Sequence, residues 1–582
     1  MEQSQSIAGY HLHTQNNHSP SIISAMDQFA SNFTALGARE ESPLSTPYAS
    51  LNDPYQFSRA GKWMLFLAIP TGTTALWLLW AFVLRLWLLR RYYERQGIRF
   101  VKDCYAVVGA EMRVEKLREK NQSHDYLYTD RPTDLYGTMR GFSIQLYATS
   151  AGLCEELLAQ TGKHVDRNTP ALFSFGQLSP NALSFSRTNK GRFLERKNTL
   201  TRGMKVNKRL YEIVSRQAEE AMERFKIKNG SGATINIREL LNHWTREIAG
   251  EIVWGRNNIN RDLEVLDSNG ELKSFPFMTA LNNNFTDLRF YALRFWNRVC
   301  FPLATLPLTK EARRLRFNVK VLRKAIEDMM NTPEDETVAA NVQEANLTIG
   351  IPDEVTRDDL TTGTIAGLDP VKATLMGALY HLLRPANLSW RQQILAEINE
   401  IKAQPGEMYI KLSHAPKLNA FIDETLRYDP PGSLLNNEAV NDFDLSSGDR
   451  QYKIKSGTRI VSCIHALHQN EGSWKKNVSE DMAPLSEFDP SRFLLHANDI
   501  VSSSCFMPFG KGPRRCPGQR ASILMVKAFI VAFLTENYNC KMSVPENQTD
   551  DVTWFSIYSR ATFDIHCDET PTSIQSLVTS TV

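Results

Sequence analysis

The chain has 582 residues, enough for roughly two to four average domains or for one large catalytic domain with additional segments. Hydrophobic residues make up 42% of it and the formal net charge is +3, a composition that suits a globular core. No arginine-rich tract or nucleic-acid-binding motif is present, so we set nucleic acid aside as a partner.

The cysteines indicate a reducing environment for most of the chain. The eight residues are widely scattered and none forms a C-x-x-C pair, which fits neither a disulfide framework nor a zinc site. Reducing compartments keep such cysteines as free thiols. They are Cys104, Cys154, Cys300, Cys463, Cys505, Cys516, Cys540 and Cys567.

The N-terminal part predicts a membrane anchor. Residues 1–62 are polar and rich in Ser, Asn, Gln and His, and we expect them to be disordered. Residues 63–84 contain no charge, and a helix of this length reaches ~33 Å, enough to cross a bilayer core. A cleaved signal peptide would start near residue 1, so the position favours a retained anchor over a signal, and the length and flanking arginines disfavour a buried core helix.

Positive charges flank the anchor unevenly, with more of them after it than before it. The positive-inside rule then places the bulk of the chain in the cytosol and residues 1–62 in the lumen, as in a single-pass protein of the endoplasmic reticulum. In that orientation Asn17 and Asn32 are the glycosylation candidates, and seven further N-x-S/T sites stay unmodified. The arginines that follow the span are Arg85, Arg90, Arg91, Arg95 and Arg99.

Further along, we interpret residues 85–121 as a linker, 122–569 as the catalytic domain and 570–582 as a polar tail. Apolar spacing predicts two helices within 190–228, then helices over 237–252 and 310–330, whereas 332–351 is polar and predicted to be a loop. His243 is more consistent with a packed or capping histidine than with a metal ligand, because no second histidine lies at ligand spacing.

Residues 360–383 are too apolar on all sides for a surface helix, and they predict a long buried helix. Pro370 lies inside it. A proline there removes one backbone hydrogen bond and clashes with the carbonyl four residues earlier, that of Ala366, so we expect a kink.

Glu424 and Arg427 share one helix face within 415–431, a segment that ends at a Pro-Pro pair. An E-x-x-R pair alone is weak evidence. The chain has at least three others, at Glu115/Arg118, Glu311/Arg314 and Glu354/Arg357.

The most informative stretch is 506–518, FMPFGKGPRRCPG. Its glycines and prolines predict a tight irregular loop, and the apolar segment 519–534 after it predicts a buried helix. Cys516 therefore lies just before a helix N-terminus, where backbone N–H groups and the helix dipole favour a thiolate, the form that binds metal. The alternative is a buried structural cysteine, which is the usual state of a free cysteine.

This stretch resembles the haem-binding loop of the cytochrome P-450 family, F-G-x-G-x-R-x-C-x-G. The resemblance implies that Cys516 is the axial thiolate ligand of haem iron and that the rest of the loop binds the cofactor. The fold it implies is mainly α-helical with small β-sheets, preceded by a single transmembrane helix. The matching loop positions are Phe509, Gly512, Arg514 and Gly518.

The oxygen-binding helix of the family, (A/G)-G-x-(D/E)-T, matches Ala366, Gly367 and Asp369, but Pro370 replaces the usual threonine. In the family that hydroxyl helps to bring protons to dioxygen. Asp369 remains as a possible proton relay, and Thr374, one turn later, is a second hydroxyl. The alternative interpretation of Pro370 is that it only kinks a core helix.

Other family positions are partly kept. The propionate-facing W-x-x-x-R pair is replaced by Phe193 and Lys197, with Arg196 as an alternative donor, although a solvated charged face explains either basic residue equally well. After the Pro-Pro pair, Asn436 or Asn437 stands in for an arginine that reaches a propionate.

The resemblance also implies that Glu424 and Arg427 join Arg492, from the segment 488–493, in a structural charge network under the haem loop. Several basic residues near the cysteine suit an acidic flavin-bearing reductase, or simply a solvated surface. They are Lys511, Arg515, Arg520 and Lys527.

Three functions remain open. The first, which we favour, is a monooxygenase that takes electrons from NADPH through a partner NADPH-cytochrome reductase and inserts one oxygen atom into a lipophilic small molecule. The second is a reductase-independent haem-thiolate isomerase or dehydratase that acts on a peroxide substrate, since such members often lack the threonine. The third is a non-catalytic haem-binding membrane protein. The long polar lead resembles fungal enzymes of specialised metabolism, which tailor terpenoids, polyketides or alkaloids.

Overall fold

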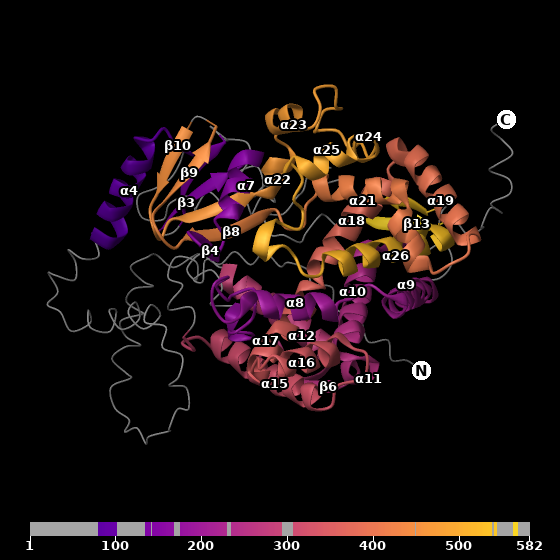
Figure 1. Ribbon diagram of the computed structural model, residues 1–582. Helices are drawn as coiled ribbons and strands as arrows, with labels where there is room; N and C mark the ends of the chain where they lie inside the picture. The colour runs from indigo at the N-terminus through magenta and orange to yellow at the C-terminus, as the bar shows by residue number, and fades with distance from the viewer. Residues whose placement is uncertain are drawn as a thin grey trace, which may run out of the picture. The chain divides into compact units, whose positions relative to one another are not determined.

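The computed structural model describes residues 80–101, 134–140, 143–167, 175–229, 234–293, 306–448, 450–537, 540–543 and 563–567. All of them belong to one compact unit, Trp77–Val582, which is mainly helical with small sheets, as predicted (Figure 1). Of the expected anchor only Trp80–Leu84 is described, as the short π-helix η1. Within the described ranges, no helix combines the length and apolarity that a membrane span requires.

The largest sheet packs between helix α4 (Arg85–Glu94) and helix α7 (Ala151–Ala159) in one apolar cluster. The outer strand β1 (Arg99–Phe100) and helix α4 fall in the segment 85–121, which was expected to be a linker. Tyr93 anchors α4 to the rest of the unit through a 2.7 Å hydrogen bond with Thr458. In sheet order the strands are β1 (Arg99–Phe100), β2 (Leu135–Arg140), β3 (Ser143–Ala148), β11 (Arg459–Cys463), β8 (Leu434–Ala439) and β4 (Val165–Arg167).

Three smaller sheets complete the strands. The hairpin β9 (Phe443–Ser447) and β10 (Arg450–Ile454) lies beside the largest sheet in Figure 1. The others are the hairpin β6 (Asp262–Leu266) and β7 (Leu272–Pro276), and the antiparallel set β12 (Cys540–Ser543), β13 (Asp564–Cys567) and β5 (Thr234–Asn236).

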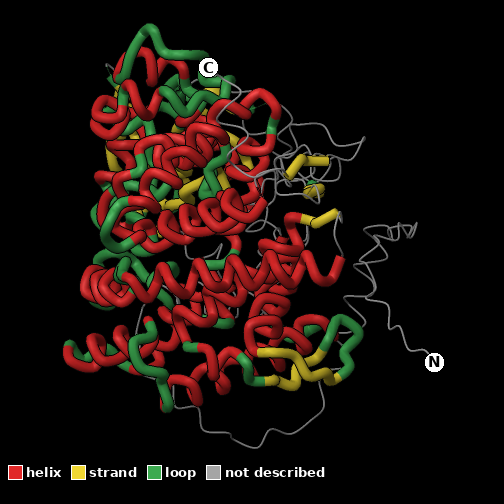
Figure 2. The backbone as a smooth tube through the Cα atoms, turned by 90° about the vertical axis from the view of Figure 1, so that its right-hand side faces the viewer, coloured by secondary structure: helices red, strands yellow, loops and turns green. Residues whose placement is uncertain are grey.

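Long helices form the rest of the unit (Figure 2). Their buried apolar residues fall in two clusters. Helix α10 contributes to both clusters, and the helices predicted near 190–228, 237–252, 310–330 and 519–534 are all confirmed. The long helices are α8 (Phe193–Gly203), α9 (Lys208–Asn229), α10 (Ile237–Trp254), α12 (Phe277–Leu293), α15 (Lys310–Asn331), α16 (Val338–Thr348), α17 (Asp353–Ala366), α18 (Asp369–Leu383), α19 (Leu388–Ala403), α21 (Pro416–Tyr428) and α26 (Gln519–Asn537).

The shorter helices connect these elements. They are η3 (Phe175–Gln177), α11 (Arg256–Ile259), η4 (Pro385–Asn387), α20 (Met408–Lys411), η5 (Leu412–His414), α22 (Ile464–His468), α23 (Glu471–Asn477), α24 (Arg492–Leu495), α25 (Ala497–Ser502) and η6 (Gly512–Arg514).

Two helix predictions were wrong. The segment 332–351, predicted as a loop, contains α16, because the Thr337 side chain caps it and its apolar face is buried against α15 and α17. The single kinked helix predicted over 360–383 is two helices that break at Gly367–Leu368. Pro370 lies in the first turn of α18, where its missing N–H costs nothing.

Candidate active site

The cysteine loop closes on itself just before helix α26. The backbone N–H of Cys516 donates to the carbonyl of Phe509 at 3.0 Å, so the loop returns to its own start. Gly510 and Gly512 have φ angles of +70° and +73°, which side chains other than glycine rarely adopt. The loop therefore holds Cys516 three residues before the first residue of α26, as the spacing of the motif predicts.

The thiol of Cys516 lies in a mixed environment. The side chain is solvent-accessible and free, yet the surrounding protein raises its pKa, because desolvation outweighs every other effect. Backbone N–H groups of Gly518 and Gln519, together with the charge of Lys197, lower the pKa in the opposite direction. The expected thiolate-stabilising donors are present, but without a metal they do not bring the pKa below its ordinary value.

Glu424 lies at the centre of a fully buried ion network. Its carboxylate accepts bidentate hydrogen bonds from Arg427 at 2.7 and 2.8 Å and one from Arg492 at 3.2 Å. It also accepts the backbone N–H of Asp489 at 2.7 Å. Both guanidinium groups reach further to backbone carbonyls, including that of Glu487. Two guanidinium groups thus share one carboxylate, and the directed hydrogen bonds to backbone carbonyls hold both of them in place.

His468, which sequence reasoning did not select for a role, joins this network to the cysteine loop. The backbone N–H of Met507 donates to its Nε2 at 3.0 Å, and its Nδ1 lies 3.3 Å from the carbonyl of Arg427. The neutral tautomer with a proton on Nδ1 satisfies both contacts. Complete burial lowers the pKa of His468 to about 3, which keeps that neutral form.

The break between α17 and α18 arranges the residues expected to bind oxygen. Gly367 closes α17, and its N–H is shared between the carbonyls of Gly363 and Thr364, both at 3.1 Å. Ala366 ends α17, and Pro370 has no N–H to offer its carbonyl. The hydroxyl of Thr374 donates to the carbonyl of Pro370 at 2.9 Å.

Asp369 is held by an ion pair at the start of α18. Its carboxylate lies 2.7 Å from Nζ of Lys372, and both side chains are largely buried. The same Nζ donates to Oδ1 of Asn242 on α10 at 2.8 Å. The possible relay residue is therefore part of a polar chain that leads from α18 to α10.

Two neighbouring cations on α8 have different roles. Lys197 donates to the carbonyl of Pro513 at 2.7 Å and lies close enough to Cys516 for their charges to interact. Arg196, the alternative donor, is buried and forms two hydrogen bonds to Asp359 of α17, at 2.8 and 2.6 Å. The position that faces the cysteine loop is therefore Lys197, whereas Arg196 joins α8 to α17.

Arg514 is engaged by protein groups in this structure. Its guanidinium contacts the carboxylate of Asp166 at 3.0 Å and the hydroxyl of Thr188 at 2.7 Å. It also lies over the ring of Phe193, with 4.4 Å to the centroid. Burial, together with the neighbouring charge of Arg167, lowers the pKa of Arg514 to about 10.

The comparison with known proteins decides the family. The sequence pattern of the family described as Cytochrome P450 matches residues 105–558, which is well over half of the chain. The chain belongs to the cytochrome P450 family.

Individual relatives are distant and match in part. The chain is 25% identical to cytochrome P450 97B2, chloroplastic, of Glycine max over 228 residues, which is 36% of this chain and 39% of that protein. It is 25% identical to a cytokinin hydroxylase of Arabidopsis thaliana over 328 residues, 53% of this chain and 60% of that protein. Thromboxane-A synthase of Sus scrofa is 29% identical over 173 residues, 29% of this chain and 30% of that protein. The matches thus span less than two thirds of these relatives.

Cytochromes P450 bind haem through a cysteine thiolate, and the residues of this chain fit that cofactor. Among the described residues, Arg167 Nε and Asn437 Nδ2 are buried nitrogen donors without a hydrogen-bond partner. They are direct cross-strand neighbours on β4 and β8, and Asp166 joins this pair to Arg514. Unpaired buried donors call for acceptors such as the carboxylates of haem. Between the two expected substitutes, Asn437 fits better, because its amide nitrogen is buried without a hydrogen-bond partner whereas the side chain of Asn436 is exposed.

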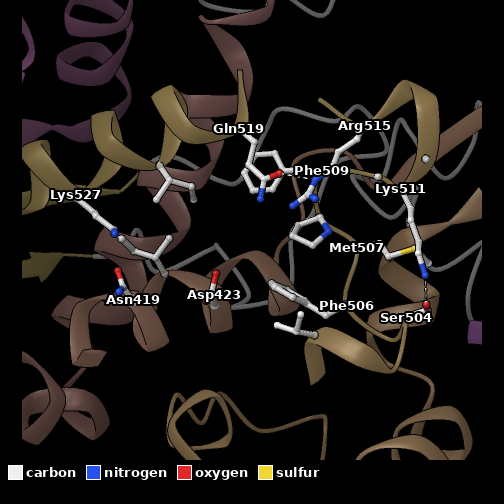
Figure 3. A pocket seen from close by; sticks show the side chains of 16 residues that line it. Asn419, Asp423, Ser504, Phe506, Met507, Phe509, Lys511, Arg515, Gln519 and Lys527 are labelled. Atoms are coloured by element: carbon white, nitrogen blue, oxygen red, sulfur yellow. Dashed lines mark hydrogen bonds between the residues drawn. The ribbon is translucent and has the colours of Figure 1, made fainter. Parts of the chain in front are cut away.

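The face beside the cysteine loop carries a pocket of about 490 Å³ between α21, the loop and α26 (Figure 3). Lys511 and Arg515 are exposed at this pocket, and Lys511 contacts the carboxylate of Glu155 and the hydroxyl of Ser504. Lys527 is different, since only 7% of it is exposed and it donates to the carbonyl of Leu412. Asp423 shares the pocket, and burial raises its pKa to about 7 although nearby Lys527 lowers it.

His243 contacts charged side chains through both ring nitrogens. Its Nδ1 lies 3.7 Å from Glu247 and its Nε2 lies 2.9 Å from Arg224. In the part of the chain that the structure describes, no group of three His, Cys, Asp or Glu side chains is placed to hold a metal ion. The glycosylation candidates Asn17 and Asn32 lie outside the described residues.

Proposed function

We propose that the chain is a haem-thiolate monooxygenase that inserts one oxygen atom from O2 into a lipophilic small molecule. The observation that carries this proposal is the accessible thiol of Cys516, presented by a self-closed loop that the Glu424 network supports from behind through His468. When bound, haem with an axial thiolate supplies the oxygen-activating chemistry.

The protein's own part is to hold the thiolate and the cofactor carboxylates. Lys197 and the N–H groups of Gly518 and Gln519 favour the ionised sulfur, so they offset part of the desolvation that metal binding must overcome. Arg167 and Asn437 are the donors available to carboxylates of haem, and Arg514 lies next to them although Asp166 and Thr188 already engage it.

Proton delivery differs from the pattern of the family because Pro370 has no hydroxyl. We assign the relay to Asp369, which is held by the ammonium of Lys372, and the same ammonium donates to Oδ1 of Asn242. A positioned carboxylate typically contributes about 10²–10⁴-fold to a proton-transfer step. Thr374 is a weaker candidate, since its hydroxyl proton is given to the carbonyl of Pro370.

Electrons come from NADPH through a partner NADPH-cytochrome reductase that docks on the face of Lys511 and Arg515. We place the protein in the endoplasmic reticulum membrane, with residues 63–84 as the single anchor, the catalytic domain in the cytosol, and Asn17 and Asn32 glycosylated in the lumen. An exposed apolar stripe supports membrane contact, because its residues recur at helical spacing. They are Trp80, Leu84, Trp87 and Leu88.

The first test is the reduced carbon monoxide difference spectrum of the protein in microsomes. A Soret band near ~450 nm is expected for thiolate ligation, and Cys516→Ser should abolish it. Cys505→Ser, at a buried cysteine that is also close to the loop, is the matched control and should keep the band. Folded, haem-loaded protein without the band would refute the assignment of Cys516.

The second test is turnover of a panel of lipophilic substrates with NADPH, reductase and isotopically labelled O2. Label in the product supports the monooxygenase. Conversion of a hydroperoxide without NADPH would instead support the isomerase, for which the absent threonine at Pro370 is the motivating observation. We propose specialised metabolites (terpenoids, polyketides or alkaloids) as the substrate class, and a fungal type of enzyme. Haem binding without turnover of any substrate would support the third hypothesis, a non-catalytic haem-binding membrane protein.

A further inference from the structure

A second cavity, of about 650 Å³, is lined by Gly363 and Gly367 at the C-terminal end of α17. Its volume is in the range of cavities that bind small molecules. The proposed haem ligands and donors do not line it, and of the proposed site residues only Gly367 does. The elements around it are α8, α9, α10, α16, α17 and α26.

The inner wall of this cavity is apolar. Ala249, Ile252 and Val253 line it from α10, and Ala521 and Met525 line it from α26. Ile252 packs against both helical clusters, so the cavity lies where the two cores meet. Burial of an apolar molecule against such a wall is favourable, because it removes apolar surface from water.

The mouth of the cavity is basic. Arg202, Lys205, Lys208 and Arg209 line it, whereas Glu336 is the acid on the lining and is already paired with Arg209 at 2.8 Å. Lys208 is paired with Glu407 at 3.2 Å.

Two of these cations remain for a ligand. Arg202 and Lys205 are exposed and form no ion pair with any described acid. The first turn of α9 also lacks an acidic residue, so the positive end of that helix dipole adds to the field at the mouth.

We propose that this cavity binds a small amphipathic monoanion, with its acid group at Arg202 and Lys205 and its apolar body along α10 and α26. A carboxylate with a long alkyl chain has this chemistry. A neutral lipophile would leave the cations unused, and a small inorganic anion would leave the apolar wall exposed to water.

Gly363 provides a selective way to fill the cavity. It lines the cavity from α17, and a Cβ built there has no neighbouring atom within 4 Å. Gly363→Leu therefore projects a side chain into open space, and it replaces a helical glycine with a better helix former. Gly152→Leu is the matched control, because Gly152 is helical, equally open and absent from the cavity lining.

The experiment uses the haem-loaded protein with an azole on the iron, which occupies the substrate side. A fluorescent fatty acid, 11-(dansylamino)undecanoate, is titrated and then displaced with dodecanoate or with dodecanol. We expect one saturable site, displacement by dodecanoate and not by dodecanol at equal concentration, and binding at least about tenfold weaker in Gly363→Leu. Gly152→Leu should bind like the wild type, and both variants should keep the carbon monoxide band.

Charge reversal tests the mouth. Arg202→Glu with Lys205→Glu should weaken the probe about tenfold or more, whereas Lys163→Glu, an exposed lysine outside the lining, should not. Loss of probe binding when the azole is added would place the probe in the substrate cavity and overturn the proposal. So would equal competition by dodecanol, or unchanged binding in Gly363→Leu. If charge reversal changes only the affinity for the reductase, these cations serve a protein partner and the proposal is also wrong.

Discussion

Replacing His468 with alanine should destabilise the protein far more than an average histidine substitution. The ring is completely buried and satisfies the N–H of Met507 and the carbonyl of Arg427, which lie in segments far apart in the sequence. Leaving two buried backbone groups unpaired costs about 1–3 kcal/mol each, and the emptied ring volume adds to this. We therefore expect the free energy of unfolding to fall by roughly 3–6 kcal/mol.

The assay is urea unfolding of the haem-loaded protein, followed by tryptophan fluorescence and by the Soret band. His468→Gln keeps a donor and an acceptor, so its loss should be smaller than that of His468→Ala. His414→Ala, at an exposed histidine, is the control and should stay within about 0.5 kcal/mol of the wild type. Because His468 holds the cysteine loop, the alanine variant should also lose part of the ~450 nm band.

The pH dependence gives an independent check. Burial lowers the pKa of His468 to about 3. Between that value and the ordinary histidine pKa, the unfolded state binds a proton at this residue and the folded state does not. This contribution to stability is complete above about pH 6.5 and is lost as the pH falls towards 3. His468→Ala should lack that part of the decline. A change below about 1 kcal/mol at neutral pH, with an intact Soret band, would refute the role of this histidine.

Three further predictions concern carboxyl groups. Glu424→Gln leaves Arg427 and Arg492 without a counter-charge and should lower the free energy of unfolding by about 3–5 kcal/mol, against no change in the exposed control Glu344→Gln, in urea titrations. Burial raises the pKa of Asp423 to about 7, so the wild type loses stability as the pH rises from about 4 to 7. Asp423→Asn should then be more stable than the wild type by about 1–3 kcal/mol at pH 8 and equally stable near pH 4. The difference stays this small because the carboxyl group lines an open pocket, where solvent screens its charge. Asp369→Asn should slow NADPH-dependent product formation by about 10²-fold or more while the carbon monoxide band is kept, and an unchanged rate would exclude the relay.

Features written in short sequence spacings were predictable. The loop 506–518 carries its glycines, its cysteine and the start of α26 in a fixed order, so its geometry follows from local rules. The same holds for Glu424 and Arg427, because an i,i+3 pair on one helix face can meet without any help from the rest of the fold.

Features that depend on distant partners were not predictable from spacing. The partner of Arg514 is Asp166, 348 positions away, and that of Arg196 is Asp359, 163 positions away. Helix α16 lies in a polar segment, and its apolar face is recognisable only once α15 and α17 cover it. The role of His468 depends on two backbone groups that carry no side-chain signature at all.

The contacts that hold α17 and α18 explain how these two helices can be separate. Arg196 ties α8 to Asp359 of α17, while the next residue, Lys197, ties α8 to the carbonyl of Pro513 in the cysteine loop. Helix α8 therefore connects the cysteine loop to α17 through two adjacent residues. The other helix, α18, is held through Lys372 to α10. Because each helix has its own anchor, α17 and α18 keep separate contacts although the backbone breaks between them at Gly367–Leu368.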